Sequence, residues 1–316
     1  MCDDLAIVTC YFNPCGYRNR EIGYARFVEG LARQGVSPWT MEATLPGQER
    51  FVPEGDRVFH VELPAHDWLW QKERLLNLLV QQLPGDISKV AWVDCDLLFT
   101  NDQWPRLTSQ ALDTWPVIQL FEFAFWLGPQ DEILSWQGKA DRRASLACLA
   151  MHYPDRAQDF RICTPGFAWA AQRSLLEKHG LYEFEVTGGG DTMISLALYG
   201  WLDHPFLHTG TRAMIHDGKN YARSLYQDVK GYVGYIPNHI KHLWHGSYES
   251  RNYVDRRLKL QELKLDPFRD LCYDNETKLL RWTEFANPQL REYVRSYFRS
   301  RREDDCGLAS SVSNVE

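Results

Sequence analysis

The sequence lacks a long apolar run. Although 44% of its 316 residues are hydrophobic, no segment approaches the ~20 residues needed to span a bilayer. Its first residues, Met1 to Leu5, show neither the basic start nor the extended apolar stretch of a secretory signal. With a mean hydropathy of -0.43, we expect a globular chain without a transmembrane segment, located in the cytoplasm.

Paired cysteine motifs, a basic overall charge and internal repeats are also missing. The eight cysteines are scattered, and no Cys-x-x-Cys or Cys/His spacing suggests structural zinc, so we expect reduced thiols. A net charge of -7 argues against a general nucleic-acid-binding surface. What the chain has in excess is aromatic: its 12 Trp and 15 Tyr suit either stacking on sugars or bases, or a Trp-rich core.

Alternating strand and helix patterns predict an α/β fold. Apolar runs at Leu5–Phe12, Trp39–Leu45 and Arg57–Val61 are typical of strands. Helical spacing of apolar residues covers 17–34 and 68–83. Strand and helix in this rhythm predict a mainly parallel, mixed sheet flanked by helices, with ligands at the carboxyl ends of the strands.

The second half of the chain predicts a change of organisation. We expect a strand over 117–123, a polar loop-like region over 129–160 with a helical middle at 144–151, and charged helices from 251 ending in an amphipathic helix over 290–301. This pattern divides the chain into a domain over 1–250, a helical extension over 251–302 and a disordered tail over 303–316.

An acidic pair follows the central strand candidate, which runs from Lys89 to Phe99. Alternation along a strand sends Asp94 and Asp96 to the same side. Two carboxylates aimed together repel unless a proton or cation lies between them, and Mn²⁺ or Mg²⁺ prefers oxygen ligands. The motif therefore suggests a metal–diphosphate site, although for a bare Asp-x-Asp the commoner explanation is that one acid is a solvated strand end and the other caps the next segment.

Two later clusters carry further candidate groups. Gly188-Gly189-Gly190-Asp191 precedes an apolar helix, which places Asp191 near a helix N-terminus where it can accept a proton from a bound hydroxyl; an N-cap after a flexible loop is the alternative. His242 and His245 lie three residues apart before a glycine, and can ligate a metal or donate to a phosphate, or serve the fold.

Other classes of protein share parts of this layout. A haloacid-dehalogenase-like phosphatase also has Asp-x-Asp after a strand and a later Gly-Asp, but here Ser195 stands where its further acid is expected, and the histidines stay unused. A sugar-nucleotide pyrophosphorylase requires a Gly-rich basic first loop, which residues 11–16 lack. A noncatalytic carbohydrate-binding protein explains the tryptophans but not the ordered acids.

Taken together, over residues 5–250, the motifs resemble a GT-A fold nucleotide-sugar-dependent glycosyltransferase of the broad galactosyltransferase-like and family-2-like group. The resemblance implies that Asp94 and Asp96 hold Mn²⁺ or Mg²⁺ on the diphosphate of a UDP-sugar, with His245 completing the coordination and His242 in reserve. It makes Asp191 the base of an inverting transfer. One departure is that inverting relatives have adjacent acids here, whereas Asp191 stands between Gly190 and Thr192.

The same resemblance assigns the remaining site residues. Thr9, Tyr11 and Asn13, at the end of the first strand, would face the nucleotide base, and Lys72 or Arg74 would reach the ribose-diphosphate. Gly189 and Gly190 would line the donor site, and Trp169, with Trp126, would form an apolar wall for a sugar ring. The acceptor is left open among a glycan, another hydroxyl-bearing molecule and a hydroxylated nucleic-acid base.

Overall fold

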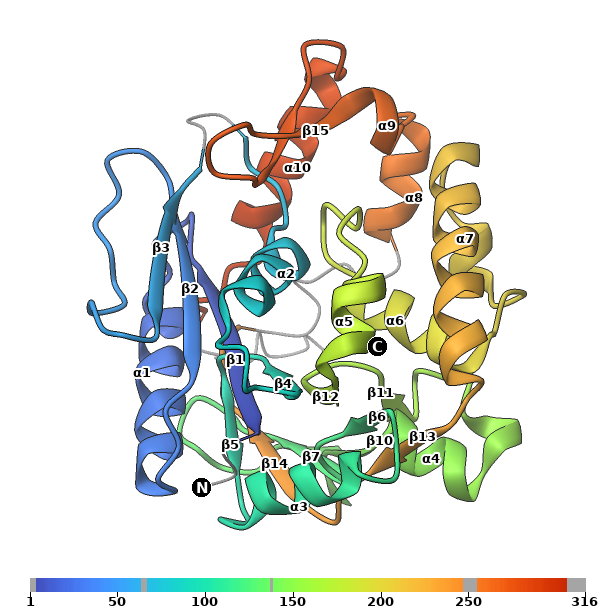
Figure 1. Cartoon of the computed structure of the whole chain (residues 1–316). Helices are drawn as coiled ribbons and strands as arrows, with labels where there is room; N and C mark the ends of the chain where they lie inside the picture. The colour runs from blue at the N-terminus through green and yellow to red at the C-terminus, as the bar shows by residue number, and fades with distance from the viewer. Residues whose placement is uncertain (1–3, 64–66, 137–138, 247–254, 306–316) are drawn as a thin grey trace, which may run out of the picture.

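The computed structural model describes residues 4–63, 67–136, 139–246 and 255–305 (Figure 1). Two sheets form its centre. In order across the first sheet, the strands are β13 (Val233–Tyr235), β6 (Val117–Gln119), β12 (Ala168–Gln172), β4 (Lys89–Val93), β1 (Leu5–Phe12), β2 (Trp39–Thr44) and β3 (Val58–Glu62). The second sheet contains β11 (Cys163–Thr164), β10 (Arg142–Ser145), β7 (Phe123–Trp126), β14 (His239–His242) and β5 (Leu97–Phe99).

The first sheet is mixed and mostly parallel. β1 runs parallel to β2 and β4, β2 to β3, and β13 to β6, whereas β12 lies antiparallel between β4 and β6. The predicted α/β fold with a mainly parallel mixed sheet is therefore confirmed. β4 and β5 belong to different sheets, so the short segment between them passes from one sheet to the other.

Helices cover both faces of the first sheet. The helices of the described residues are α1 (Arg18–Arg33), α2 (Lys72–Gln82), α3 (Trp104–Leu112), α4 (Leu146–His152), α5 (Arg173–His179), α6 (Gly190–Tyr199), α7 (Arg212–Val229), α8 (Asp255–Glu262), α9 (Pro267–Asp270) and α10 (Pro288–Ser300). Short 3₁₀ helices lie at Pro154–Arg156 and Pro205–His208.

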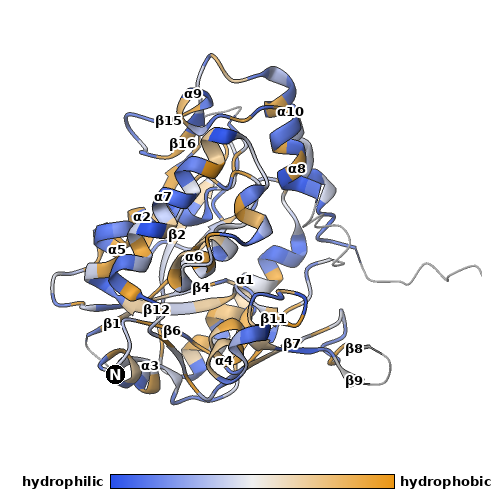
Figure 2. Cartoon of the chain, turned by 90° about the vertical axis from the view of Figure 1, so that its right-hand side faces the viewer, coloured by the Kyte–Doolittle hydropathy of each residue, from blue (hydrophilic) through white to orange (hydrophobic). Residues whose placement is uncertain are grey.

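Alternation along β1 separates two hydrophobic cores. Ala6 and Val8 pack with apolar residues of α2, α6 and α7. Leu5 and Ile7 face the opposite side, where α1, α3 and the second sheet pack. α6 is apolar along most of its length (Figure 2), because it is buried on most sides. Among the described residues, no helix has the length and apolar character needed to cross a membrane.

Several local predictions are wrong in detail. The predicted helix over 68–83 begins only at Lys72, because Trp68 and Leu69 instead pack in a third core against α10. The strand expected over 117–123 is divided between β6 and β7, which lie in different sheets. The region 129–160 contains the expected helix, α4, but also β10 and the pair β8 (Ser135–Trp136) and β9 (Lys139–Ala140), which its polar sequence conceals.

The C-terminal region packs onto the rest of the chain. α8, α9 and α10 gather at one end with the hairpin of β15 (Leu271–Tyr273) and β16 (Leu280–Trp282) (Figure 1). Their apolar residues share a core with Trp68, Leu69 and Val186. The predicted boundary at 250/251 lies outside the described residues. The predicted disordered tail begins at 303, yet Glu303 is only 1% exposed, and residues 306–316 lie outside the described part.

Candidate metal and catalytic site

The acidic motif lies in a turn between the two sheets. β4 ends immediately before Asp94, and the chain turns through Asp96 before β5 begins. The Asp94 N–H donates to the Phe167 carbonyl at 2.8 Å, and the Leu243 N–H donates to the Asp96 carbonyl at 2.9 Å. Both acids therefore lie past the end of the strand. The backbone hydrogen bonds of the turn, and not strand alternation, set the directions of the two side chains.

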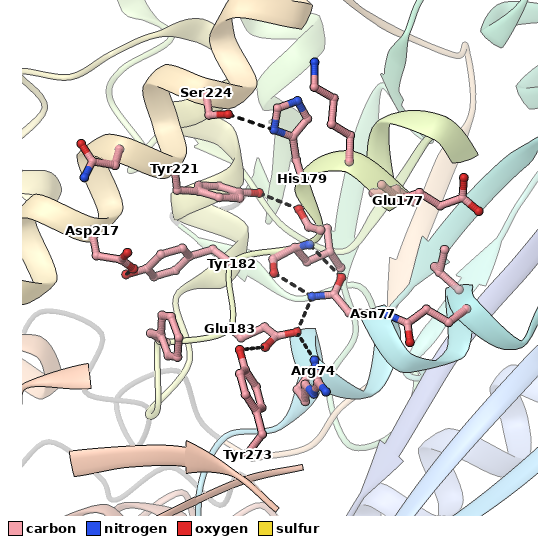
Figure 3. Close-up of a pocket in the computed structure, with 18 residues that line it drawn as sticks. Arg74, Asn77, Glu177, His179, Tyr182, Glu183, Asp217, Tyr221, Ser224 and Tyr273 are labelled. Atoms are coloured by element: carbon pink, nitrogen blue, oxygen red, sulfur yellow. Dashed lines mark hydrogen bonds and ion pairs between the residues drawn. The ribbon is translucent and has the colours of Figure 1, made fainter. Parts of the chain in front are cut away.

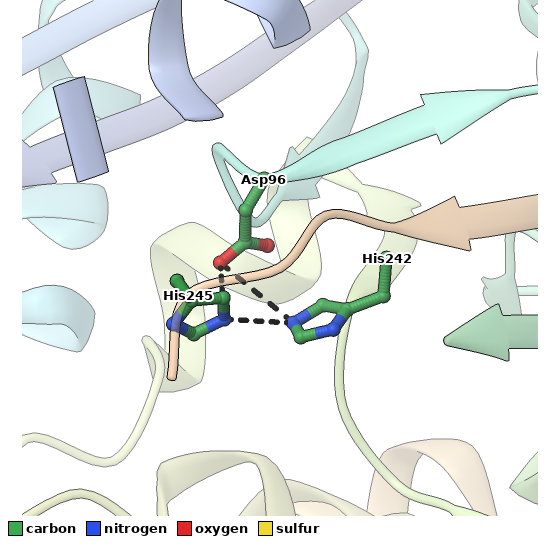
Figure 4. Close-up of side chains that lie close together, drawn as sticks. All are labelled: Asp96, His242 and His245. Atoms are coloured by element: carbon green, nitrogen blue, oxygen red, sulfur yellow. Dashed lines mark hydrogen bonds and ion pairs between the residues drawn. The ribbon is translucent and has the colours of Figure 1, made fainter. Parts of the chain in front are cut away.

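Asp96 lies against two histidines. His245 Nε2 is 3.1 Å from Asp96 Oδ2 and 2.9 Å from His242 Nε2 (Figure 4). His242 Nε2 is 3.9 Å from the same carboxylate oxygen. His242 is the last residue of β14, and the three-residue spacing brings His245 back to the same point. The sequence left a choice between the two histidines, and the structure brings both of them to Asp96.

These three residues, Asp96, His242 and His245, fit a divalent cation. Their ligand atoms all lie within 4.8 Å of one another, and two ligands at right angles about an ion at ~2.1 Å are about 3 Å apart. Asp96 Oδ1 is buried and has no hydrogen-bond partner in the described structure. Two imidazoles favour a transition metal, and the carboxylate suits Mn²⁺ among them.

The two histidines also influence the charge of Asp96. Burial raises the pKa of this carboxyl, but His242 and His245 outweigh burial and hold the pKa well below its usual value. Asp96 is therefore an ionised carboxylate. The site thus offers three possible metal ligands: an ionised carboxylate whose Oδ1 is unpaired among the described residues, and two imidazoles.

Asp94 does not join this group. Its Oδ1 lies 2.6 Å from Lys72 Nζ, and the same ammonium is 3.1 Å from both carboxylate oxygens of Asp191. Burial raises the pKa of Asp94 to about 6; Lys72 opposes this shift, and Asp191 and Asp96 add to it. In the described structure Asp94 thus pairs with Lys72, and the cluster of possible ligands contains Asp96 without Asp94.

The glycine loop places Asp191 as the sequence predicts. α6 begins at Gly190, and Asp191 lies in its first turn. Gly188 and Gly189 have φ values of +84° and +131°, which side chains rarely allow. A Cβ at Gly190 would lie 2.1 Å from Glu73 Oε1. The loop thus needs glycine both for its backbone and for the close approach of α2, which carries Lys72 to Asp191.

Aromatic rings enclose His242. The Phe167 ring stacks on the His242 ring, with 4.8 Å between centroids and 28° between planes, and Trp126 lies 6.1 Å away. Phe167 has φ +81°, an uncommon conformation for a residue with a side chain. Backbone strain of this kind costs of order 1–3 kcal/mol and gathers at functional sites. Trp126, which the sequence predicts as part of a wall for a sugar ring, lies beside His242.

The residues predicted to hold the nucleotide base are packed within the protein. The Thr9 hydroxyl donates to the Val93 carbonyl at 2.7 Å. The Tyr11 ring is 2% exposed and packs 5.0 Å from Tyr24. The amide of Asn13 is bonded through both its nitrogen and its oxygen to the Tyr17 backbone, each at 2.9 Å. Since these groups are already used, the assignment of Thr9, Tyr11 and Asn13 to a base is corrected.

Trp169 is a core residue, not a sugar platform. Its side chain has 0% exposure, and its indole N–H donates to the Pro165 carbonyl at 2.8 Å. It packs in the core with residues of α2 and α6. The sequence placed it at a site because tryptophan commonly stacks on sugars, but this position on β12 points into the protein.

Substitution of Trp169 by phenylalanine tests this correction. Trp169→Phe removes the indole donor at 2.8 Å from the Pro165 carbonyl and leaves it with the longer bond from the Ser195 hydroxyl at 3.4 Å, which costs about 1–3 kcal/mol in the free energy of unfolding. Urea titration is expected to show this loss, while the folded variant keeps the UDP binding that the sequence analysis predicts for the wild-type protein. Weaker UDP binding without loss of stability would return Trp169 to the ligand site.

Arg74 lies in a separate pocket of about 690 Å³ (Figure 3). Its Nη1 is 3.2 Å from Glu183 Oε1, and its guanidinium lies 4.4 Å from the centre of the Tyr273 ring. Asn77 and Tyr273 also donate to Glu183, at 2.6 and 2.8 Å. Of the two cations considered for the diphosphate, only Lys72 lies with the candidate site, and the assignment of Arg74 is corrected.

Two charged residues near the histidines were missed by the sequence analysis. Arg20 lines a small cavity with Asp96 and His245, and Nη1 of Arg20 is 3.3 Å from Glu303 Oε2. Arg20 precedes the buried Tyr24 by four residues, so helical spacing already places it on the inner face of α1. No local sequence pattern identifies Glu303 as buried, because it lies in a segment of charged residues.

Comparisons with known proteins give only remote similarities. No family model and no curated protein sequence matches the chain. One similar solved structure is a Drosophila β1,4-galactosyltransferase 7 mutant in complex with manganese, UDP-Gal and xylobiose. The alignment covers 73% of this chain and 63% of that chain, which is less than two thirds of its length, with 12% identity and a TM-score of 0.35. The catalytic domain of the same enzyme with xylobiose aligns over 92% and 98%, with 12% identity and a TM-score of 0.41.

A glucose-1-phosphate thymidylyltransferase from Bacillus anthracis, putative by its description and in complex with a sucrose, aligns over 81% of this chain and 95% of that chain, with 9% identity and a TM-score of 0.32. The chain is thus similar to structures of nucleotide-sugar enzymes. At these identities and TM-scores the similarity assigns no activity, and the function has to be argued from the side chains of the site.

Proposed function

We propose that the chain is a metal-dependent glycosyltransferase that transfers a sugar from a UDP-sugar to an acceptor hydroxyl. The observation that carries this proposal is the convergence of Asp96, His242 and His245 beside the Lys72–Asp191 ion pair. One turn of chain, Asp94 to Asp96, connects the two groups. A cation site and a candidate base so close together suit the transfer of a group from a diphosphate.

Asp96, His242 and His245 would hold the cation, for which Mn²⁺ is the proposed ion. When bound, the ion supplies positive charge that neutralises the leaving nucleoside diphosphate. Lys72 carries a further positive charge nearby, because its partly buried ammonium lies between Asp94 and Asp191. The ionised carboxylate of Asp96 holds the two imidazoles in place.

Asp191 is the proposed base. Its side chain is 30% exposed, so it is open to a second substrate, and Lys72 keeps its carboxylate oriented. The carboxylate takes the proton of the acceptor hydroxyl, and the acceptor oxygen forms a bond to the anomeric carbon. The bond from that carbon to the diphosphate oxygen breaks, and its electron pair leaves with the nucleotide. Attack from the face opposite the leaving group inverts the anomeric configuration.

The alternatives explain fewer of these contacts. A haloacid-dehalogenase-like phosphatase gives no role to His242 and His245. A noncatalytic carbohydrate-binding protein is suggested by the many tryptophans, but Trp104 and Trp169 are fully buried core residues. The acceptor stays a proposal by chemical class: a glycan, another hydroxyl-bearing molecule, or a hydroxylated nucleic-acid base.

Thermal unfolding with nucleotide tests the donor and the metal together. UDP with Mn²⁺ is expected to raise the melting temperature far more than UDP with EDTA, because a ligand that binds only the folded state stabilises it by mass action. At a ligand concentration of 100 Kd the stabilisation is about 2.7 kcal/mol. Mn²⁺ without nucleotide serves as the control.

Equal stabilisation by UDP in EDTA would rule out the cation as a bridge to the diphosphate. A panel of nucleotide sugars with Mn²⁺ then identifies the donor through slow hydrolysis in the absence of acceptor. Stabilisation by free sugars but by no nucleotide would favour the carbohydrate-binding alternative instead.

A further inference from the structure

The C-terminal segment after α10 returns to the histidine site. The Trp244 indole N–H donates to the Asp305 carbonyl at 2.9 Å. The carboxylate of Asp304 accepts from the backbone N–H groups of Arg18 and Asn19, at 3.1 and 2.8 Å, at the start of α1. Directly after Glu303, the segment is therefore bonded both to the start of α1 and to Trp244, the neighbour of His245.

Glu303 is a buried carboxylate held by two guanidinium groups. Arg301 Nε and Nη2 each lie 2.5 Å from Glu303 Oε1, and Arg20 Nη1 lies 3.3 Å from Oε2. The side chain is 2% exposed. A buried carboxylate costs several kcal/mol unless it is paired, and these two arginines provide the pairing. Oε1, which accepts from Arg301, also lies within ion-pair distance of a third group.

That third group is the imidazole of His245. Glu303 Oε1 lies 3.7 Å from His245 Nδ1, within ion-pair distance though longer than a hydrogen bond. The other ring nitrogen, Nε2, faces Asp96 and His242. The two nitrogens of one ring thus meet two different environments: a carboxylate on the outer side and the candidate cation site on the inner side.

An imidazole that ligates a metal through one nitrogen carries its hydrogen on the other. A carboxylate beside that outer nitrogen favours the required tautomer, fixes the plane of the ring and makes the inner nitrogen a better ligand. Metal-binding histidines almost always have such an outer partner. Glu303 stands where the outer partner of His245 is expected if His245 Nε2 ligates a cation.

We infer that Glu303 is a positioning residue for the metal ligand His245, and that the C-terminal segment thereby completes the cation site of the catalytic domain. The inference rests on the proposed function, because it requires a cation at Asp96, His242 and His245. It gives the segment after α10 a role in metal affinity in addition to its role in packing.

Mn²⁺ titration of the full chain, with free Mn²⁺ measured by electron paramagnetic resonance, tests the inference with and without saturating UDP. Glu303→Gln is expected to raise the Kd for Mn²⁺ by ~10–100-fold, the usual effect of removing an outer partner of a ligand. Glu303→Asp keeps the charge but withdraws it by one methylene, and should give a smaller rise. Melting temperatures identify the variants that fold.

Asp304→Asn is the matched control, since Asp304 anchors the same segment to α1 through backbone N–H groups. It should leave the Mn²⁺ affinity unchanged. If the wild-type protein binds Mn²⁺, two results would overturn the role of Glu303 but leave the proposed metal site intact. One is equal weakening of Mn²⁺ binding by Glu303→Gln and Asp304→Asn, and the other is no weakening by Glu303→Gln. A wild-type protein that binds no Mn²⁺, with or without UDP, would overturn the proposed metal site as well.

Discussion

Asp96→Asn is expected to reduce glycosyl transfer to background and to remove the stabilisation by Mn²⁺ that depends on UDP. The substitution keeps the shape of the side chain but removes the charge that faces both histidines, at 3.1 Å from His245 Nε2 and 3.9 Å from His242 Nε2. Two neutral imidazoles and an amide bind a divalent ion far less well than a site with an ionised carboxylate. Transfer assays and melting curves with UDP and Mn²⁺ measure both effects.

Two controls make this result specific. Asp131→Asn removes a surface carboxylate that is 56% exposed and paired with Arg26, so it should change neither stability nor metal dependence noticeably. Asp94→Asn separates the two acids of the motif: it should disturb Lys72 and leave Mn²⁺ binding largely in place. If Asp94→Asn removes Mn²⁺ binding and Asp96→Asn does not, Asp94 is the metal ligand and our assignment is wrong.

The parts of the fold that the sequence predicted correctly are those set by local periodicity. The apolar run of β1 alternates between two cores, and the spacing of Tyr24, Phe27 and Leu31 marks the inner face of α1. Periodicity shows that a residue is buried, but it does not show what covers it. Tyr11 was assigned to a nucleotide base from its place at the carboxyl end of the first strand, whereas Tyr24 and Phe51 cover its ring.

The site was predictable where its residues lie in short motifs. The three-residue spacing of His242 and His245 and the glycines before Asp191 were both visible in the sequence. The ion pair between Lys72 and Asp191 joins residues 119 positions apart, and that between Arg20 and Glu303 joins residues 283 apart. Such pairs depend on how the sheets bring distant segments together, and no local pattern reports them.

Asp191→Asn is expected to lower turnover by ~10²–10⁴-fold, the usual contribution of a general base, while binding of UDP and Mn²⁺ stays near normal. The amide keeps the shape of the side chain in the first turn of α6 but cannot accept the acceptor's proton. Steady-state kinetics should show the loss in kcat, and calorimetric titration with UDP and Mn²⁺ should show the unchanged affinity. Because Lys72 also pairs with Asp94, its ammonium keeps one partner in the variant.

The stereochemistry of the product decides the same question independently. A protein base that activates the acceptor implies direct attack on the anomeric carbon, so NMR should find opposite anomeric configurations in donor and product. Retention of configuration, or near-normal turnover by Asp191→Asn, would leave Asp191 as a residue that only pairs with Lys72 at the start of α6. The proposed metal site at Asp96, His242 and His245 would remain valid, because its ligands do not include Asp191. The transfer would then proceed without a protein base.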